Sequence, residues 1–267
     1  MYQPTMDLAG QVCFRPNFFQ TRVRINYLID RYLNDTVLCD RLDNLPQQFI
    51  DPQPRQWSYV NWRAIHPQQV VGLELNIFLS IIKDAFDTKA LIRDYSQTSR
   101  QYLEPIHPSM AKLVGGIVAE DGTAIELGLW EKEHCQHTPA LKRLYQQLAR
   151  SITPAAKTAT GYKAQTNPYQ DLYKHGLHQV VTEYSAACLY LWLMSHTTGT
   201  VQQIFGELLQ DEINYLAKFW DMGMWLYPNG AEHLIRYLLR QIHTILAVSL
   251  ESPATIKSTF ERMIISN

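Results

Sequence analysis

Two short stretches decide how this chain folds, Leu127-Gly-Leu-Trp-Glu-Lys-Glu-His134 and Asp211-Glu-Ile-Asn-Tyr215. Each places a glutamate, Glu131 or Glu212, one helical turn before a second candidate metal ligand, because residues three apart on a helix share a face. Paired ligands of this kind on buried helical faces are typical of metal centres inside helical bundles. The two stretches therefore predict a di-metal carboxylate centre within a bundle.

The composition narrows the class of protein. The chain has 267 residues, of which 46% are hydrophobic, which is enough for one large core. A formal charge of −1 without a basic block argues against a nucleic-acid partner. No apolar run approaches the roughly 20 residues of a membrane span, and the start lacks signal-peptide features, so we expect a cytoplasmic protein. The four scattered cysteines predict reduced, mostly packed thiols.

Helical periodicity dominates the chain, and the predicted fold class is all-α. We expect residues 1–267 to form a single domain in three parts. Residues 1–60 hold a helix followed by a proline-rich stretch and form an N-terminal cover. Residues 67–220 form the metal-binding four-helix bundle, and residues 225–267 contain an amphipathic helix that packs outside it.

The first predicted hairpin supplies three of the candidate ligands. After Pro67 an apolar stripe repeats at helical spacing, and Glu74 falls in its middle, so Glu74 is expected to point inward. A second helix, predicted across residues 113–148, carries Glu131 and His134 on its buried face.

Two further residues, Glu133 and His137, lie close in sequence to the predicted ligands Glu131 and His134. Glu133 is expected on the solvated side of the helix, so that its removal would leave metal binding intact. His137 lies one turn past His134, and we expect the helix to need a bend or a rotation to bring it to the site.

The second predicted hairpin is tighter. One helix runs through Glu183, a turn follows at His196-Thr-Thr-Gly199, and the next helix runs through Glu212. The two glutamates are equally far from the turn, and antiparallel helices rise by the same amount per residue. Their carboxylates are therefore expected to meet.

These residues resemble the ligand set of the ferritin-like di-iron and di-manganese bundles, in which two helices each give a Glu and two others each give Glu-x-x-His. The resemblance covers roughly residues 67–220, and Trp130-Glu-Lys-Glu-His134 with Asp211-Glu212 look like the corresponding helices of the soluble acyl-carrier-protein desaturases. It implies two iron ions, with manganese as the other candidate metal, and these ligands: Glu74, Glu131, His134, Glu183 and Glu212.

One position departs from the pattern. Tyr215 stands where the fourth helix of the family has histidine. Its phenolate could bind ferric iron, its hydroxyl could hold a water, or it could make no metal contact.

The resemblance implies an oxidoreductase that activates O₂ at the metal and acts on a hydrophobic organic substrate, with an electron donor that the sequence does not identify. The alternatives are iron handling, as in ferritin-type cages, and a ferritin-like scaffold with an incomplete or absent metal site that acts as a binding or regulatory protein. A homodimer is compatible with the amphipathic terminal segments.

Overall fold

The computed structural model describes residues 5–6, 12–13, 18–34, 36, 54–89, 92–105, 107–121, 123–149 and 168–226. Most of these residues are helical, so the all-α class is confirmed. The helix expected within residues 225–267 and the side chains of Cys13 and Cys39 lie outside the described part of the chain.

The elements follow one another from a short N-terminal hairpin to a long helical pair. The strands β1 and β2 span Thr5–Met6 and Val12–Cys13, and β3 and β4 span Ile117–Val118 and Ala124–Glu126; each pair is antiparallel. Two 3-10 turns, η1 and η2, cover Trp62–Ala64 and Pro67–Gln69. The helices are α1 (Phe18–Tyr32), α4 (Leu75–Lys89), α5 (Ile92–Leu103), α6 (Pro108–Gly115), α7 (Leu129–Ala149), α8 (Pro168–Ser195) and α9 (Gly199–Leu226).

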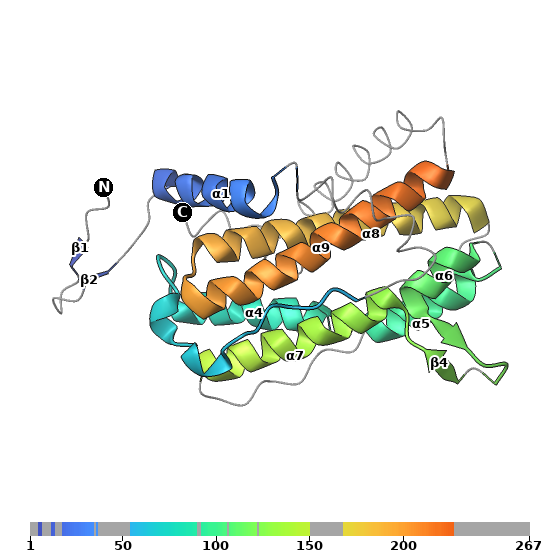
Figure 1. The fold of residues 1–267 in the computed structure, drawn as a ribbon, viewed down its shortest axis with the longest axis horizontal. Helices are drawn as coiled ribbons and strands as arrows, with labels where there is room; N and C mark the ends of the chain where they lie inside the picture. The colour runs from blue at the N-terminus through green and yellow to red at the C-terminus, as the bar shows by residue number, and fades with distance from the viewer. Residues whose placement is uncertain are drawn as a thin grey trace, which may run out of the picture.

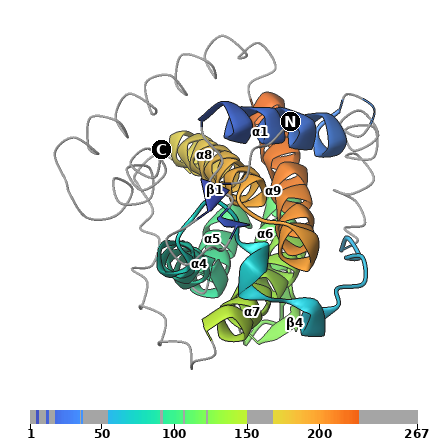
Figure 2. The same cartoon turned by 90° about the vertical axis from the view of Figure 1, so that its left-hand side faces the viewer.

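The long helices run alongside one another as two pairs. The helices α8 and α9 form one antiparallel pair and α4 packs against α7 in the other, with α1 across the outside of α8 (Figures 1 and 2). The helix α5 continues beyond α4 toward the end of the molecule where α6 and the β3–β4 hairpin lie (Figure 1). Among the described residues, no helix combines the length and the apolar character that a membrane span requires.

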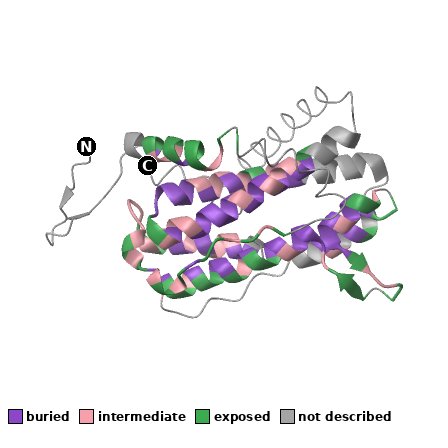
Figure 3. Cartoon of the chain, in the orientation of Figure 1, coloured by how far each residue is buried: buried purple, intermediate pink, exposed green. Residues whose placement is uncertain are grey.

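The main core lies between these two pairs (Figure 3). Its contribution from α4 is a stripe at three- and four-residue steps, which is the periodicity the sequence predicts. Removing this apolar surface from water drives the helices together, at about 25 cal/mol for each Å² buried. The most deeply buried members from α4 and α7 are Phe78, Ile81, Ile82, Phe86, Leu141, Leu144 and Leu148.

The continuous helix predicted across residues 113–148 is wrong. The chain leaves α6 at Gly116, which has φ +77° and ψ −150°, a conformation that only glycine adopts readily. A β3–β4 hairpin follows, and helical structure resumes at Leu129. The buried face that carries the predicted ligands therefore begins at the first turn of α7. The glycine-containing first half of the predicted helix is not part of it.

The cysteine expectation holds only in part. Cys188 is partly buried, but Cys135 is exposed on α7, and neither forms a disulfide. A small apolar side chain next to a predicted ligand was expected to be packed, whereas this one points away from the core.

The turn between α8 and α9 buries a histidine. His196 stacks on Trp192, with 4.6 Å between ring centroids, and its Nδ1 lies 3.2 Å from the carbonyl oxygen of Val71. Burial lowers the pKa of the ring, although the hydrogen bond to Val71 acts in the opposite direction. The neutral ring is thus the form that the fold prefers.

Acid is expected to weaken folding through His196. Its pKa is lower in the folded state than in the unfolded state, so the unfolded chain takes up the proton first as the pH falls. This contribution to stability is complete above the unfolded value of about 6.5 and is lost as the pH drops toward the folded value. His196→Asn, which keeps a donor for Val71, should lose less unfolding free energy between about pH 7.5 and about pH 5.5 in urea denaturation. An unchanged pH dependence in this variant would contradict the assignment.

Candidate metal centre

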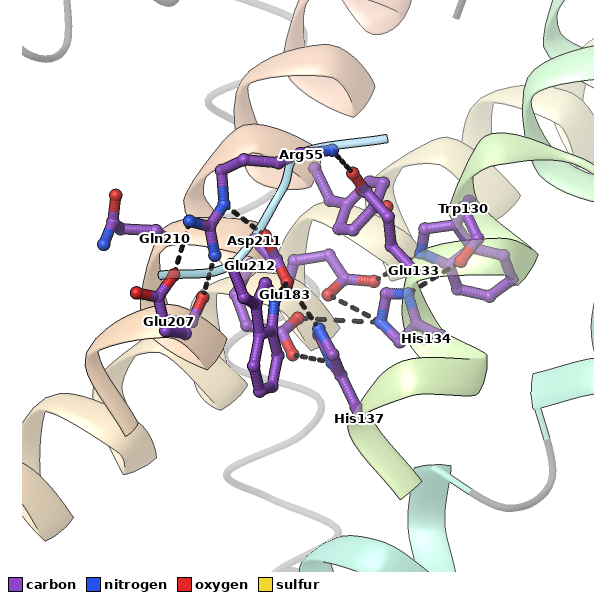
Figure 4. Close-up of polar contacts among 12 residues, drawn as sticks. Arg55, Trp130, Glu133, His134, His137, Glu183, Glu207, Gln210, Asp211 and Glu212 are labelled. Atoms are coloured by element: carbon purple, nitrogen blue, oxygen red, sulfur yellow. Dashed lines mark hydrogen bonds and ion pairs between the residues drawn. The ribbon is translucent and has the colours of Figure 1, made fainter. Parts of the chain in front are cut away.

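Two histidines and a glutamate gather in the interior between α7 and α9. His134, His137 and Glu212 each offer one donor atom, and these three atoms all lie within 4.8 Å of one another. All three side chains are buried, and Figure 4 shows them facing one another. The cluster could hold a metal ion.

The spacing of the donors differs from that of hydrogen-bonded partners. Glu212 Oε1 lies 3.3 Å from His137 Nδ1, and Glu212 Oε2 lies 3.7 Å from His134 Nε2. Direct hydrogen bonds between nitrogen and oxygen are typically about 2.7–3.2 Å long. When two donor atoms each lie about 2.1 Å from the same ion in tetrahedral geometry, the two atoms are about 3.4 Å from each other. Both observed distances are longer than a direct hydrogen bond and lie near this separation.

The imidazole of His134 is oriented by its own helix. Its Nδ1 lies 3.0 Å from the carbonyl oxygen of Trp130, which can only accept, so Nδ1 carries a proton. In the neutral ring Nε2 is then unprotonated, and it lies 3.6 Å from Glu183 Oε2 and 3.7 Å from Glu212 Oε2. Histidine ligands in proteins are commonly fixed by a hydrogen bond of this kind at the other nitrogen.

The imidazole of His137 is oriented in an equivalent way by Asp211. Its Nε2 lies 3.0 Å from Asp211 Oδ2, which leaves Nδ1 toward Glu212. Burial raises the pKa of Asp211, but the hydrogen bond and charge of His137 and the charge of Arg55 outweigh this effect, so the net pKa is lowered. An ionised Asp211 is therefore available to accept the Nε2 proton.

The helix α8 contributes Glu183 to the same place. Glu183 Oε2 lies 3.6 Å from His134 Nε2, while Oε1 accepts a hydrogen bond of 3.0 Å from the indole nitrogen of Trp130. Glu183 and Glu212 thus approach the same imidazole nitrogen. Their equal distance from the α8–α9 turn predicts this meeting, and the structure confirms it.

Tyr215 is buried beside the cluster, but its hydroxyl points elsewhere. The hydroxyl donates to the carbonyl oxygen of Leu129 at 3.4 Å, and the ring lies against His134 with 5.0 Å between centroids. Of the three roles open to this residue, the geometry favours packing without metal contact.

Glu131 is buried on α7 as predicted, but its carboxylate is engaged by another helix. Its Oε2 accepts hydrogen bonds of 2.8 Å from Ser96 Oγ and 2.6 Å from Gln97 Nε2, both on α5. The cluster of His134, His137 and Glu212 does not include it.

The inward orientation predicted for Glu74 is wrong. Glu74 is exposed and precedes α4, where its carbonyl oxygen accepts the hydrogen bond of Phe78 N. The chain after Pro67 forms a short 3-10 turn instead of the first turn of a long helix. The helical phase that would have aimed Glu74 at the core is therefore absent at this position.

The two neighbours also differ from expectation. His137 needs no bend or rotation, because a three-residue step from His134 keeps it on the same helical face. Glu133 is buried, with 2% exposure, because residues 54–58 cover its side of α7. Burial and the nearby charge of Asp211 raise the pKa of Glu133, although the backbone N–H of Arg55 acts in the opposite direction.

Negative charge is concentrated in this interior. Tyr190, fully buried on α8, has a pKa raised well above the ordinary value by burial and by the charges of Glu212, Glu183 and Asp211. Lys218 is buried nearby, and burial lowers its pKa despite the charges of Glu133 and Asp211. The buried carboxylates of α7, α8 and α9 are Glu131, Glu133, Glu183, Glu207, Asp211 and Glu212.

The residues that sequence reasoning missed come from outside the bundle or lie next to a predicted ligand. Arg55 and Trp57 lie in the proline-rich stretch, where no periodicity marks them, and both contact Asp211. Asp211 itself carried a signal, since it adjoins Glu212 in the stretch that predicts the site. No protein-family model, curated protein or solved structure matches this chain.

Proposed function

We propose that this chain is a metal-dependent oxidoreductase in which His134, His137 and Glu212, with Glu183, hold a transition-metal ion, which we assign as iron. The observation that carries the proposal is the orientation of the two imidazoles: each has one nitrogen beside an acceptor and the other directed at Glu212. Two histidines and one carboxylate with open positions are the ligand set of non-haem iron oxygenases, and Glu183 would add a second carboxylate to that set here.

The charge of the interior supports a cation at this position. Within the described residues of α7, α8 and α9, six carboxylates are buried, and Arg55 forms ion pairs with two of them, Glu207 and Asp211. Ionised groups that are buried without compensation cost several kcal/mol each. A divalent ion would offset part of this excess.

A ferritin-like relationship with two metal ions is part of the proposal. The order of helices and the Glu131–His134 pair support it. Glu131 is the candidate ligand for a second ion, which would compete with Ser96 and Gln97 for its carboxylate. The stoichiometry of bound metal distinguishes one ion from two.

The chemistry that iron would supply is the activation of O₂ for the oxidation of an organic substrate. The protein's own contribution is to orient the imidazoles, to exclude water and to leave coordination positions open. Apolar side chains in the surrounding core favour a hydrophobic substrate. The electron donor is an additional partner that this proposal requires.

Metal content is the direct test. Protein purified from cells supplied with iron and manganese is expected to hold one or two metal ions per chain by elemental analysis. His134→Ala should lose the metal, with an affinity loss beyond the roughly 10- to 100-fold that follows from removing an outer-shell partner. Gln136→Ala is the matched control, because Gln136 is exposed on the same helix. Equal metal content in the two variants, or none in the wild type, would refute the site.

Oxygen uptake then tests the activity. Iron-loaded wild type with a chemical reductant is expected to consume O₂ faster than His134→Ala under the same conditions. If metal-loaded wild type consumed O₂ no faster than His134→Ala, the metal site would stand but the oxidoreductase function would be rejected.

A further inference from the structure

Residues 54–58 form a docked segment across α7 and α9, far from both helices in the sequence. The backbone N–H of Arg55 donates to Glu133 Oε1 on α7, and the backbone N–H of Ser58 donates to Glu207 Oε1 on α9 at 3.2 Å. Figure 4 shows Arg55 reaching over this polar side of the centre. The segment is thus fixed to both helices that carry the histidines and Glu212.

The side chain of Arg55 binds α9 through three nitrogens. Nε lies 2.6 Å from Asp211 Oδ1, one terminal nitrogen lies 2.6 Å from Glu207 Oε2, and the other donates to the carbonyl oxygen of Glu207 at 2.7 Å. Such charge-assisted contacts are short and directional, and the planar guanidinium makes them geometrically specific.

Trp57 also binds the carboxylate of Asp211. Its indole nitrogen donates to Asp211 Oδ2 at 2.8 Å, and this oxygen also lies 3.0 Å from His137 Nε2. Both oxygens of Asp211 are therefore held by the docked segment. Since Asp211 cannot rotate without breaking these bonds, the direction of its contact with His137 is set by Arg55 and Trp57.

We propose that Arg55 and Trp57 are positioning residues of the metal centre, which act through Asp211 to keep the proton of His137 on Nε2 and to direct Nδ1 at the metal. The inference rests on the proposed metal function. It extends that function to a segment outside the bundle, so that the centre is complete only when residues 54–58 are docked.

A purely structural role for this segment makes a different prediction. If Arg55 served only to neutralise buried carboxylates, its replacement would lower stability without a specific effect on His137. Trp57 is uncharged and cannot neutralise a carboxylate. If replacing Arg55 and replacing Trp57 both affect His137, the cause is positioning and not neutralisation.

The test compares metal affinity in Arg55→Gln and Trp57→Phe with that of the wild type, by competition of Fe²⁺ or Co²⁺ with a chelator. Each variant is expected to bind about 10- to 100-fold more weakly, the effect typical of outer-shell partners. Trp57→Phe keeps an aromatic ring and removes only the N–H, so it serves if Arg55→Gln fails to fold. Arg63→Gln, on an exposed arginine of η1, should bind like the wild type.

A double-mutant cycle shows whether the effect passes through Asp211. In an Asp211→Asn background, Arg55→Gln is expected to cause little further loss of affinity, because the residue it acts on has already been changed. The imidazole ¹⁵N signals of metal-free protein provide a second readout. His137 should carry its proton on Nε2 in the wild type and should populate both tautomers in Trp57→Phe.

The outcomes separate this inference from the function on which it rests. A wild type that binds no metal refutes both. A wild type that binds metal, together with Arg55→Gln and Trp57→Phe variants of equal affinity, refutes only the positioning role. Additive losses in the double-mutant cycle would also reject action through Asp211.

Discussion

Replacing Glu212 with glutamine is expected to abolish metal binding and to make the metal-free protein more stable. Glu212 is fully buried, and its carboxylate approaches both His134 and His137. Without metal, its charge adds to that of Glu183 and Asp211 around the same interior. Removing it should raise the free energy of unfolding by about 1 kcal/mol or more, because it relieves repulsion among the buried carboxylates of Glu212, Glu183 and Asp211.

The opposite result would follow if the cluster were a metal-free ion-pair network. Protonated histidines would then compensate Glu212, and removing one partner of a buried pair typically costs about 3–5 kcal/mol. Urea denaturation in the presence of a chelator, near neutral pH, measures the sign of the change. Glu120→Gln, at an exposed turn, is the control and should have almost no effect.

At saturating metal the wild type should be more stable than Glu212→Gln, which reverses the order of stability expected without metal. A ligand that binds only the folded state stabilises it by about 4 kcal/mol at a concentration roughly one thousand times its dissociation constant. The wild type gains this stabilisation and the glutamine variant does not. If metal stabilised both equally, the binding site would have to lie elsewhere in the chain.

What the sequence predicts correctly about the centre follows from helical geometry, although the predicted position of His137, one turn past His134, is wrong. Glu131 and His134 share a buried face of α7, and Glu183 and Glu212 meet across the α8–α9 hairpin. Both inferences need only the period of the helix and the length of one tight turn. A regular element transmits register over many residues, so local spacing is enough to bring these groups together.

The part that the sequence does not reveal depends on contacts with irregular chain. Glu133 lies on a face of α7 that would be solvated in an isolated bundle, and it is buried because residues 54–58 cover it. Glu74 fails for a related reason, since the 3-10 turn at Pro67–Gln69 interrupts the helical phase before α4 begins. Segments without periodicity carry no register, so neither their position nor their effect on a neighbouring helix can be read from spacing.

Replacing Gly116 with alanine is expected to destabilise the protein by about 3 kcal/mol or more, through strain and overpacking together. Gly116 has φ +77°, and a Cβ built there would lie 1.8 Å from the carbonyl oxygen of Glu126 and 2.5 Å from the backbone nitrogen of Gly128. Both atoms belong to the chain that enters α7. A flexible side chain could move aside, but backbone atoms can yield only if the β3–β4 hairpin shifts.

The consequence should extend to the metal centre. The backbone N–H of Gly116 donates to the carbonyl oxygen of Lys112 at the end of α6. The chain that follows β4 passes close to Gly116 and then enters α7. At the start of α7, the indole of Trp130 donates a hydrogen bond to Glu183. A displacement of this crossing would move the first turn of α7, where Trp130 and His134 lie. Metal affinity should therefore fall along with stability.

Gly199→Ala is the matched control, because Gly199 also has a positive φ, +57°, but its Cβ would meet the terminal amide of Gln69. That amide ends a flexible side chain and can move aside, so the cost should stay near the roughly 1–2 kcal/mol of left-handed strain. Chemical denaturation of both variants measures the difference. Equal losses would mean that backbone contact at Gly116 does not fix the entry to α7, whereas a larger loss at Gly116, accompanied by weaker metal binding, would show that this crossing positions the centre.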